Sequence, residues 1–389
     1  MKRILIGYDF LKELGGLERV MFFQANTLAK NFDVELVFSY VSNKEKNKIL
    51  DNLGLNKNVQ VSQIKNQGNE LLQLFLSFVN SKRIIEKEAD LIISHSFMCT
   101  RHAFEKKKRD GIPYIVMMHH PPNFLYGKSI KWVNNFPRFF AYLAGLTLGP
   151  LIKNSDKRAV GGANVILANS KYTARRIKEI YGVNPLVVYP MISEEFRIID
   201  KKDATETLLD ILKIEKNYKF ALLHGRMIRD KRPDLAVKAF ARTGCPNLVI
   251  SGTIEEEQKL KTLIHSLKIE DRVIIVGKVS KKQLVALYNL AQCFLMTAPG
   301  EDFGLTPIEA MACGCPVVAW NDGAGPSETV LSEVNGLLAK PYSVSDFSSK
   351  INSVLNKKWN KENISKSVNR FNEKEIDKIF SEIIKQNIN

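Results

Sequence analysis

The stretch 299–330 reads PGEDFGLTPIEAMACGCPVVAWNDGAGPSETV and limits the possible folds more than any other part of the sequence. The apolar run Cys293–Thr297 is expected to enter it as a buried strand, and a Pro-Gly pair ends that strand. A loop with two acidic residues leads into a predicted short helix, Thr306–Ala312, and the run PVVAW predicts a second strand. This order is half of a βαβ unit, so the loop is expected at the carboxyl edge of a parallel sheet, where open α/β sheets bind ligands.

The loop suits a ligand that carries both phosphate and hydroxyl groups. We expect the backbone N–H groups of Gly304, Leu305 and Thr306 to point out of a helix N-terminus, where the helix dipole favours an anion. Glu301 and Glu309 lie on either side of this turn, and carboxylates accept hydrogen bonds from sugar or ribose hydroxyl pairs. A structural alternative for Glu309 stays open, because TPIE has the pattern of a capping box with Pro at the first helical position.

The stretch resembles the signature of the family 4 retaining glycosyltransferases, which have the two-lobed GT-B fold. In that family a Glu-(seven residues)-Glu pattern closes on a nucleotide sugar, and here it runs from Glu301 to Glu309 and continues through Pro316. The EDFG start and the later GAGPSETV are most similar to mannosyltransferases of the O-antigen and lipid-linked oligosaccharide kind. The resemblance implies an α/β protein with two Rossmann-like, doubly wound parallel-sheet domains that face each other across a cleft.

The chain length agrees with two domains, because 389 residues exceed one ordinary core. We expect an N-terminal acceptor-side domain, 1–190, a linker over 189–200, a nucleotide-sugar domain, 200–365, and a final helix, 366–389, that returns to the first domain as in GT-B enzymes. Strands that alternate with helical segments predict parallel sheets. The expected strands, besides those of the signature stretch, are 3–8, 34–40, 58–64, 90–94, 114–119, 164–168, 218–224, 247–251 and 272–276.

Composition predicts a cytoplasmic protein. The start, MKRILIGYDF, reads as a strand rather than a signal peptide, and no uncharged apolar run of 18 residues is present. Five scattered cysteines without a C-x-x-C argue against a disulfide framework or a zinc site. The net charge of +16 leaves open an anionic membrane surface, a basic proteome or nucleic acid as its cause. No nucleic-acid motif with interleaved aromatics is present, so we expect no nucleic-acid partner, and the oligomeric state stays open.

The most apolar segment, 132–152, reads WVNNFPRFFAYLAGLTLGPLI and has basic flanks. Its uninterrupted part is too short to span a bilayer. A buried core helix, a groove for a lipid acceptor and an interfacial helix are all compatible with it. The resemblance favours the lipid interpretation, since many relatives glycosylate membrane-anchored acceptors, and it suggests a peripheral location on the inner face of the plasma membrane.

Two features of the first domain gain a role from the resemblance. Gly15-Gly16, within GGLERV before an expected helix, is by itself an ordinary strand-to-helix turn, but relatives place a Gly-Gly here against the donor's sugar-phosphate. In HHPP, at the end of an expected strand, His119 matches the His-x-Pro histidine that contacts the donor sugar in similar mannosyltransferases. His120 is the alternative, because the doubled histidine allows a shift of one residue.

In the second domain, Arg226 and Lys231 follow an expected strand and precede an expected helix. By themselves they are more simply explained as surface charges, but two cations at this spacing suit a diphosphate leaving group. The family uses the matching Arg and Lys on the donor pyrophosphate. Its Gly-x-Gly after the next strand is reduced here to Ser251-Gly252-Thr253.

The resemblance implies a retaining transfer of a sugar, with mannose from GDP-mannose expected, onto a glycan or lipid-linked acceptor. No Asp-x-Asp occurs in the sequence, so we expect a reaction without metal or cofactor, in which basic side chains replace the cation. The alternatives are a UDP-sugar transferase (glucose or N-acetylhexosamine), a GT-B nucleotide-sugar epimerase, and a non-enzymatic partner or lectin-like subunit. The expected catalytic residues are His119, Arg226, Lys231 and Glu301, and the expected donor-binding residues are Gly15, Gly16, Gly225, Val279, Asp302, Phe303, Gly304, Leu305, Thr306 and Glu309.

Overall fold

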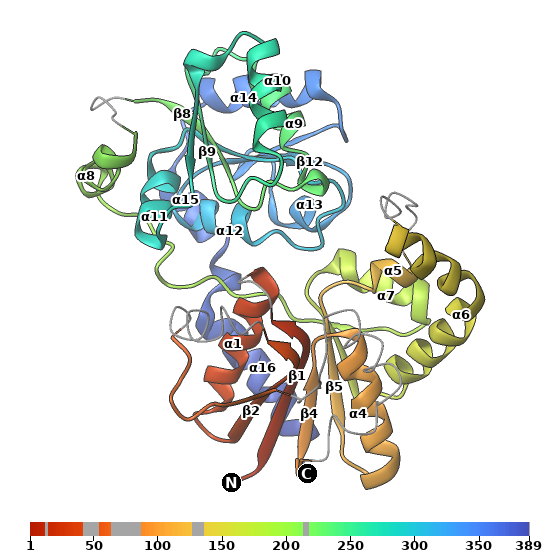
Figure 1. The fold of residues 1–389 in the computed structure, drawn as a ribbon. Helices are drawn as coiled ribbons and strands as arrows, with labels where there is room; N and C mark the ends of the chain where they lie inside the picture. Colours follow the sequence, from red (N-terminus) through yellow and green to blue (C-terminus); the bar gives the residue numbers. More distant parts are fainter. Residues whose placement is uncertain (12–14, 42–53, 64–86, 127–135, 213–217, 389) are drawn as a thin grey trace. The chain divides into compact units, whose positions relative to one another are not determined.

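The structure, a computed structural model, describes residues 1–11, 15–41, 54–63, 87–126, 136–212 and 218–388. The chain folds into two compact units. The first contains Met1–Tyr189 together with Ile376–Asn389, and the second contains Pro190–Glu375. Each unit is built around its own parallel sheet with helices connecting the strands (Figure 1).

In the described part of the first unit, seven parallel strands have the order β3-β2-β1-β4-β5-β6-β7. The order reverses between β1 and β4, as in doubly wound sheets. The strands are β1 (Arg3–Leu11), β2 (Asp33–Val41), β3 (Gln60–Gln63), β4 (Leu91–Ser94), β5 (Tyr114–Met118), β6 (Val165–Ala168) and β7 (Leu186–Val187), and the helices are α1 (Gly16–Leu28), α4 (Phe97–Asp110), α5 (Asn123–Tyr126), α6 (Phe136–Gly161) and α7 (Lys171–Tyr181).

In the described part of the second unit, six parallel strands have the order β10-β9-β8-β11-β12-β13, which reverses between β8 and β11. The strands are β8 (Phe220–His224), β9 (Asn247–Ser251), β10 (Val273–Gly277), β11 (Cys293–Met296), β12 (Val317–Trp320) and β13 (Gly336–Ala339). The helices are α8 (Lys201–Leu212), η3 (Arg229–Lys231), α9 (Pro233–Phe240), α10 (Glu257–Ser266), η4 (Glu270–Arg272), α11 (Lys281–Leu290), α12 (Leu305–Ala312), α13 (Gly325–Thr329), α14 (Val344–Asn356), α15 (Lys361–Lys366), η5 (Asn369–Phe371) and α16 (Glu373–Asn387).

The central strands are almost entirely apolar or aromatic, with Ser94 at the end of β4 as an exception, as expected for parallel sheets with helices on both faces. All residues of β4 and β5 are buried, as are all residues of β11 and β12. Helix α7 has the end residues expected from its sequence. At its start, the hydroxyl of Ser170 accepts a hydrogen bond from the backbone N–H of Thr173 at 2.9 Å, and at its end Gly182 has a left-handed φ of 71°. The prediction of an α/β protein with two doubly wound parallel sheets is confirmed.

The apolar segment 132–152 is described only in part, because residues 127–135 lie outside the described residues. From Phe136 onward the chain forms helix α6, which contains Pro150. Leu151 is exposed, as are Lys153, Lys157 and Arg158 further along the helix. Among the described residues, no helix is both long enough and apolar enough to span a membrane.

Candidate active site

The reversal of strand order in the second unit indicates at which edge of its sheet a ligand is expected to bind. Ligands of open α/β sheets bind outside the carboxyl ends of the strands at the point where the order reverses. Here that point lies between β8 and β11, which are neighbours in the sheet. The loop after β8 carries Arg226 and Lys231, and the loop after β11 carries Glu301. Topology therefore places these sequence-predicted residues at the same crevice of the second unit.

The two loops meet through an ion pair between Lys231 and Glu301. Both side chains are partly exposed, 35% for Lys231 and 19% for Glu301, so solvent or a ligand has access to them. Arg226 lies on the same loop as Lys231 and is exposed. An ammonium and a guanidinium on one loop can bind a diphosphate, and a carboxylate beside them can accept hydrogen bonds from sugar hydroxyls.

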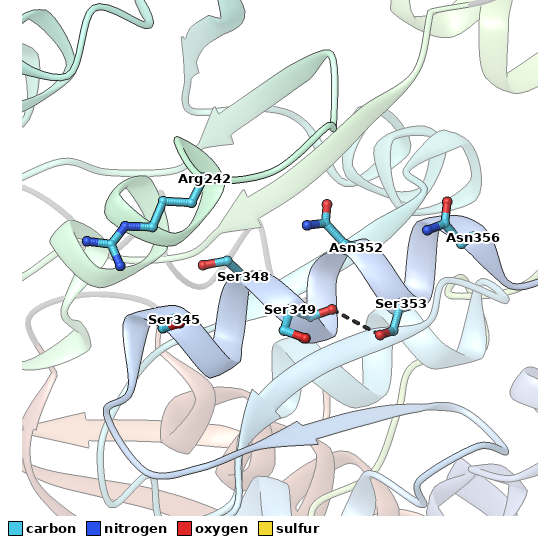
Figure 2. Close-up of a pocket in the computed structure, with 7 residues that line it drawn as sticks. All are labelled: Arg242, Ser345, Ser348, Ser349, Asn352, Ser353 and Asn356. Atoms are coloured by element: carbon cyan, nitrogen blue, oxygen red, sulfur yellow. Dashed lines mark hydrogen bonds between the residues drawn. The ribbon is translucent and has the colours of Figure 1, made fainter.

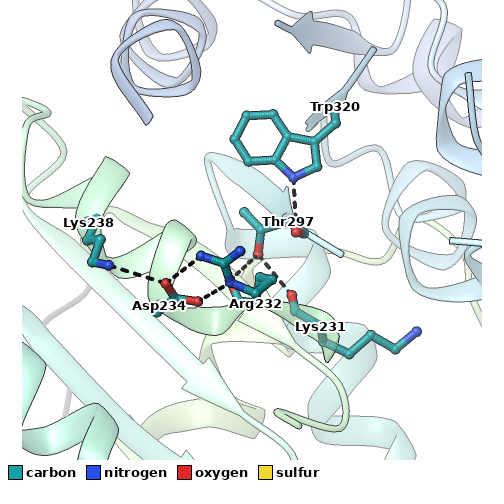
Figure 3. Close-up of polar contacts among 6 residues, drawn as sticks. All are labelled: Lys231, Arg232, Asp234, Lys238, Thr297 and Trp320. Carbon is teal, nitrogen blue, oxygen red and sulfur yellow. Dashed lines mark hydrogen bonds and ion pairs between the residues drawn. The ribbon is translucent and has the colours of Figure 1, made fainter. Parts of the chain in front are cut away.

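Thr297, the first residue after β11, fixes the turn that carries Lys231 (Figure 3). Its hydroxyl donates to the backbone carbonyls of Lys231 at 3.4 Å and Arg232 at 3.1 Å. Arg232 has a φ of 51°, a left-handed conformation that costs a non-glycine residue free energy. Its guanidinium makes two hydrogen bonds to Asp234, at 2.8 and 2.9 Å, and these contacts hold the turn.

The loop that carries Glu301 is held by the segment after β12. Trp320 donates from Nε1 to the carbonyl of Thr297 at 2.9 Å (Figure 3), and the N–H of Gly300 donates to the carboxylate of Asp322 at 2.9 Å. The N–H of Gly325 donates to the carbonyl of Glu301 at 2.8 Å. A Cβ atom on Gly325 would lie 2.4 Å from Cα of Phe303, so only glycine permits this approach.

The capping-box interpretation of TPIE is wrong. Helix α12 begins at Leu305. Its N-cap is Gly304, which has a φ of 85° and, as a glycine, has no side chain that could cap the helix. Glu309 lies more than a turn inside the helix, is 4% exposed, and is 3.4 Å from the hydroxyl of Tyr288 on α11. The carboxylate is thus not used at the helix start, and the alternative function, hydrogen bonding to a ligand, stays a prediction.

Backbone contacts join the loops that follow β8, β9 and β10. The N–H of Gly252 donates to the carbonyl of Gly277 at 2.7 Å, and that of Met227 donates to Thr253 at 2.7 Å. A Cβ atom on Gly252 would lie 2.0 Å from the carbonyl oxygen of Gly225, so the close approach of these two loops requires glycine at this position. Val279, a sequence-predicted donor contact, is half-buried on the loop before α11.

The first unit has its own reversal point, between β1 and β4. After β1, Gly15 precedes α1 and donates its N–H to the carboxylate of Glu18 at 2.8 Å; residues 12–14 lie outside the described part. Gly16 is the first residue of α1, so the glycine pair does begin a helix as predicted from the sequence. The buried carboxylate of Asp9 accepts from the N–H groups of Met98 and Cys99, at 3.0 Å each, and so occupies the start of α4.

His119 lies at the carboxyl end of β5 and is buried, whereas the neighbouring His120 is exposed. A hydrogen bond of 3.0 Å joins Nε2 of His119 to Nδ1 of His95, which follows β4. Burial lowers the pKa of His119 well below the ordinary histidine value, and a positive charge on His95 or His120 would lower it further. His119 is therefore a neutral imidazole at physiological pH.

A hollow on the second unit is unrelated to these residues (Figure 2). Arg242 lies after the end of α9, a helix that starts just after Lys231 and runs back toward the start of β9. The hollow lies along α14 and beside the end of α9, and none of its lining residues belongs to the loops that carry Lys231 and Glu301. It is lined by Arg242, Ser345, Ser348, Ser349, Asn352, Ser353 and Asn356.

Comparison with family models covers nearly all of the chain. Residues 14–196 match the model described as Glycosyltransferase Family 4, and residues 204–374 match Glycosyl transferases group 1. The chain belongs to glycosyltransferase family 4.

Relatives of this family 4 glycosyltransferase include two groups of enzymes. The α-1,3/1,6-mannosyltransferase ALG2 of Mus musculus is 30% identical over 204 residues, 48% of this chain and 49% of that protein. The D-inositol 3-phosphate glycosyltransferase of Mycolicibacterium smegmatis is 27% identical over 216 residues, 54% of this chain and 49% of that protein. The chain thus spans about half the length of the curated relatives it matches.

Solved structures agree with the fold. HepE of Anabaena, determined in complex with UDP, superposes with a TM-score of 0.75 over 99% of this chain and 100% of that chain, at 18% identity. At such low identity the likeness shows the fold alone, and that fold is GT-B, as predicted from the sequence.

Three residues of the site escaped the sequence analysis of this glycosyltransferase: Tyr288, Asp322 and His95. Asp322 lies within the signature stretch, in an Asn-Asp-Gly turn, so turn chemistry was a usable signal. Tyr288 ends the apolar run LVALY of α11, and His95 directly follows strand β4, so the sequence around each is typical of an ordinary core helix or strand end. Only the tertiary contacts reveal what these two residues touch.

Proposed function

We propose that this family 4 glycosyltransferase is a retaining mannosyltransferase that transfers mannose from GDP-mannose to a glycan or lipid-linked acceptor. The proposal that the substrate is a nucleotide sugar rests on the Lys231–Glu301 ion pair, which lies where the strand order of the second sheet reverses. Choice of mannose rests on the likeness to the ALG2 mannosyltransferases and on the EDFG and GAGPSETV motifs.

In this proposal the second unit holds the donor. Arg226 and Lys231 bind the diphosphate and stabilise the charge that develops on it as the glycosidic bond breaks. The N–H groups at the start of α12 add a partial positive charge to the same place. Glu301 accepts hydrogen bonds from the sugar hydroxyls, and Glu309 accepts them from the ribose.

The acceptor hydroxyl would attack from the face that the diphosphate leaves, with the leaving phosphate accepting its proton, so that configuration is retained. Catalysis is then mainly positioning and charge stabilisation. His119 keeps the role that the sequence resemblance implies, contact with the sugar. We propose that no metal takes part, because two basic side chains supply the positive charge that a cation would bring.

A UDP-sugar is the second candidate donor. HepE of Anabaena, a structural neighbour, was determined with UDP, with UDP and glucose, and with UDP-glucose. The loop after β10, which relatives use to read the base through backbone groups, gives no side-chain signal for guanine over uracil. Arg226 and Lys231 would bind the diphosphate, and Glu301 the sugar hydroxyls, of either donor.

A thermal-shift panel decides between these donors. GDP, GDP-mannose, UDP, UDP-glucose, UDP-N-acetylglucosamine and ADP are each added at high excess, since a ligand at 100 times its dissociation constant adds about 2.7 kcal/mol to stability. Stabilisation by GDP and GDP-mannose alone is the expected result. Stabilisation by the UDP series alone would replace mannose with a UDP-sugar. No shift with any nucleotide would overturn the proposal.

A further inference from the structure

The buried pair His95–His119 limits how His119 can meet a ligand. The two residues are 4% and 7% exposed, and the planes of their rings are 23° apart. Nδ1 of His95 is 3.0 Å from Nε2 of His119, a hydrogen-bond distance between two ring nitrogens. The two residues follow β4 and β5, adjacent strands of the sheet, so rigid elements set this distance.

Both rings are neutral in the folded protein. Burial lowers the pKa of His95 to about 3 and lowers that of His119 well below its ordinary value. A neutral imidazole carries one proton, on either Nδ1 or Nε2. Because the shared bond needs one donor and one acceptor, the tautomers of the two residues depend on each other. If His95 donates, His119 carries its proton on Nδ1; if His119 donates, its Nδ1 is an acceptor.

The environment of the other ring nitrogen of His95, Nε2, favours one of these two tautomeric states. Nε2 of His95 is buried and has no hydrogen-bond partner among the described residues. If His119 were the donor, the proton of His95 would sit on this nitrogen as a buried N–H without an acceptor. Orphaned buried N–H groups are rarer than under-satisfied buried acceptors. The favoured state therefore has the proton of His95 on Nδ1, donated to His119.

We infer that His95 is a positioning residue that holds His119 in the Nδ1–H tautomer, so that His119 offers its ligand a hydrogen-bond donor rather than a general base. A ring fixed in this way would donate from Nδ1 to an oxygen, such as a hydroxyl of the donor sugar. The consequence for sugar transfer rests on the proposed function, whereas the tautomer itself does not.

The tautomer is measured directly by ¹⁵N NMR of the full chain with labelled histidine. Protonated and unprotonated ring nitrogens have well-separated shifts, and a His119→Gln sample assigns the signal among the six histidines. In the wild type, Nδ1 of His119 should be protonated and Nε2 unprotonated. In His95→Phe, which keeps a ring but no donor, the signal should become a mixture of tautomers. In His95→Asn, whose amide can donate from near the position of Nδ1, the wild-type tautomer should persist.

Turnover of the nucleotide sugar gives the second readout. The value of kcat/KM should fall about tenfold in His95→Phe and at most about threefold in His95→Asn. A protonated Nε2 on wild-type His119 would overturn the inference even if His95→Phe does not fold. An unchanged tautomer or unchanged turnover in folded His95→Phe would overturn it as well. Absence of turnover in the wild type would instead reject the proposed function, and the tautomer would still be decided by NMR.

Discussion

The ammonium group of Lys231 and the carboxylate of Glu301 form an ion pair, although 70 residues separate them in the sequence. The pair joins the loops after β8 and β11, the two strands between which the sheet order reverses. Without a ligand, each charge is neutralised by the other. We expect a bound diphosphate to replace Glu301 as the partner of Lys231, which leaves the carboxylate available to sugar hydroxyls.

Replacement of Lys231 by Ala should cost about 2–4 kcal/mol of transition-state stabilisation, because the leaving diphosphate loses a cation; Arg226→Ala should cost a similar amount. The measurement is kcat/KM with the donor that the thermal-shift panel selects. Lys238→Ala is the matched control, since Lys238 pairs with Asp234 on α9 and the change in charge is the same. Activity of Lys231→Ala within about twofold of wild type would exclude the proposed role.

Thr297→Val should loosen the turn that carries Lys231. Valine keeps the shape of the side chain but removes the hydroxyl that bonds to the carbonyls of Lys231 and Arg232. The expected loss is about 1 kcal/mol in the free energy of unfolding, together with weaker donor binding. Urea unfolding and donor titration measure both.

The control for this change is Thr262→Val, on exposed α10, where the hydroxyl bonds to Gln258 four residues earlier at 2.9 Å. Equal effects of the two substitutions on donor binding would contradict a special role for Thr297.

Many of the strands and helices could be predicted from local sequence patterns. From Cys293 to Trp320 the strand, loop, helix and strand were predicted in the correct order, because apolar runs and glycine turns act over a few residues. The short strands β7 and β13 were missed, since two to four residues carry too little periodicity. Gly304 as the N-cap of α12 was also missed: its left-handed φ, and the 3.3 Å that would separate a Cβ atom there from Cγ of Pro326, depend on the packed loop.

Replacement of Glu309 by Gln tests whether this buried carboxylate recognises a ligand. Gln keeps the size of the side chain but removes the negative charge, so a hydrogen bond from a ribose hydroxyl should weaken by about 1.5–3 kcal/mol. Nucleotide affinity, measured by calorimetry, should fall accordingly. Because Glu309 does not cap α12, its replacement should leave the helix start intact. Unchanged affinity with a lower unfolding temperature would indicate a purely structural carboxylate.

Helix α6 tests the proposed membrane association. Leu151 is 68% exposed beside the exposed residues Lys153, Lys157 and Arg158, which suits an anionic interface. In a flotation assay the protein should rise with vesicles of anionic phospholipid at low salt and be released at high salt, where charges are screened. Leu151→Ser should weaken binding, and Leu209→Ser, at an exposed leucine of α8, should not. Absence of protein from the lipid fraction at low salt would reject this association.

The buried carboxylate of Asp156 should make the stability of the protein depend on pH. It accepts hydrogen bonds from the hydroxyls of Tyr126 and Tyr181, each at 2.8 Å, and so ties α6 to α5 and α7. Burial nevertheless raises the pKa of Asp156 above its ordinary value, against the opposing effect of these hydrogen bonds. The folded state therefore holds this proton to a higher pH than the unfolded state does.

The sign of the dependence follows from that difference. As pH rises from about 4, the ordinary value for Asp, to the raised folded pKa, the contribution of Asp156 to the free energy of unfolding falls, and above that pKa it is constant. Asp156→Asn keeps an oxygen for both tyrosines but cannot titrate, so its stability relative to wild type should increase across this window. Urea unfolding at a series of pH values measures the difference.

Asp110→Asn supplies a control of opposite sign. Hydrogen bonds from Arg109 and Lys106 lower the pKa of Asp110, so its contribution is present above about pH 4 and is lost as the pH falls through the lowered folded pKa. The Asp110→Asn variant should therefore lose stability relative to wild type as the pH rises toward 4, where Asp156→Asn begins to gain it. A pH-independent difference between Asp156→Asn and wild type would show that Asp156 titrates alike in the folded and unfolded chain, and that its burial has no net electrostatic cost.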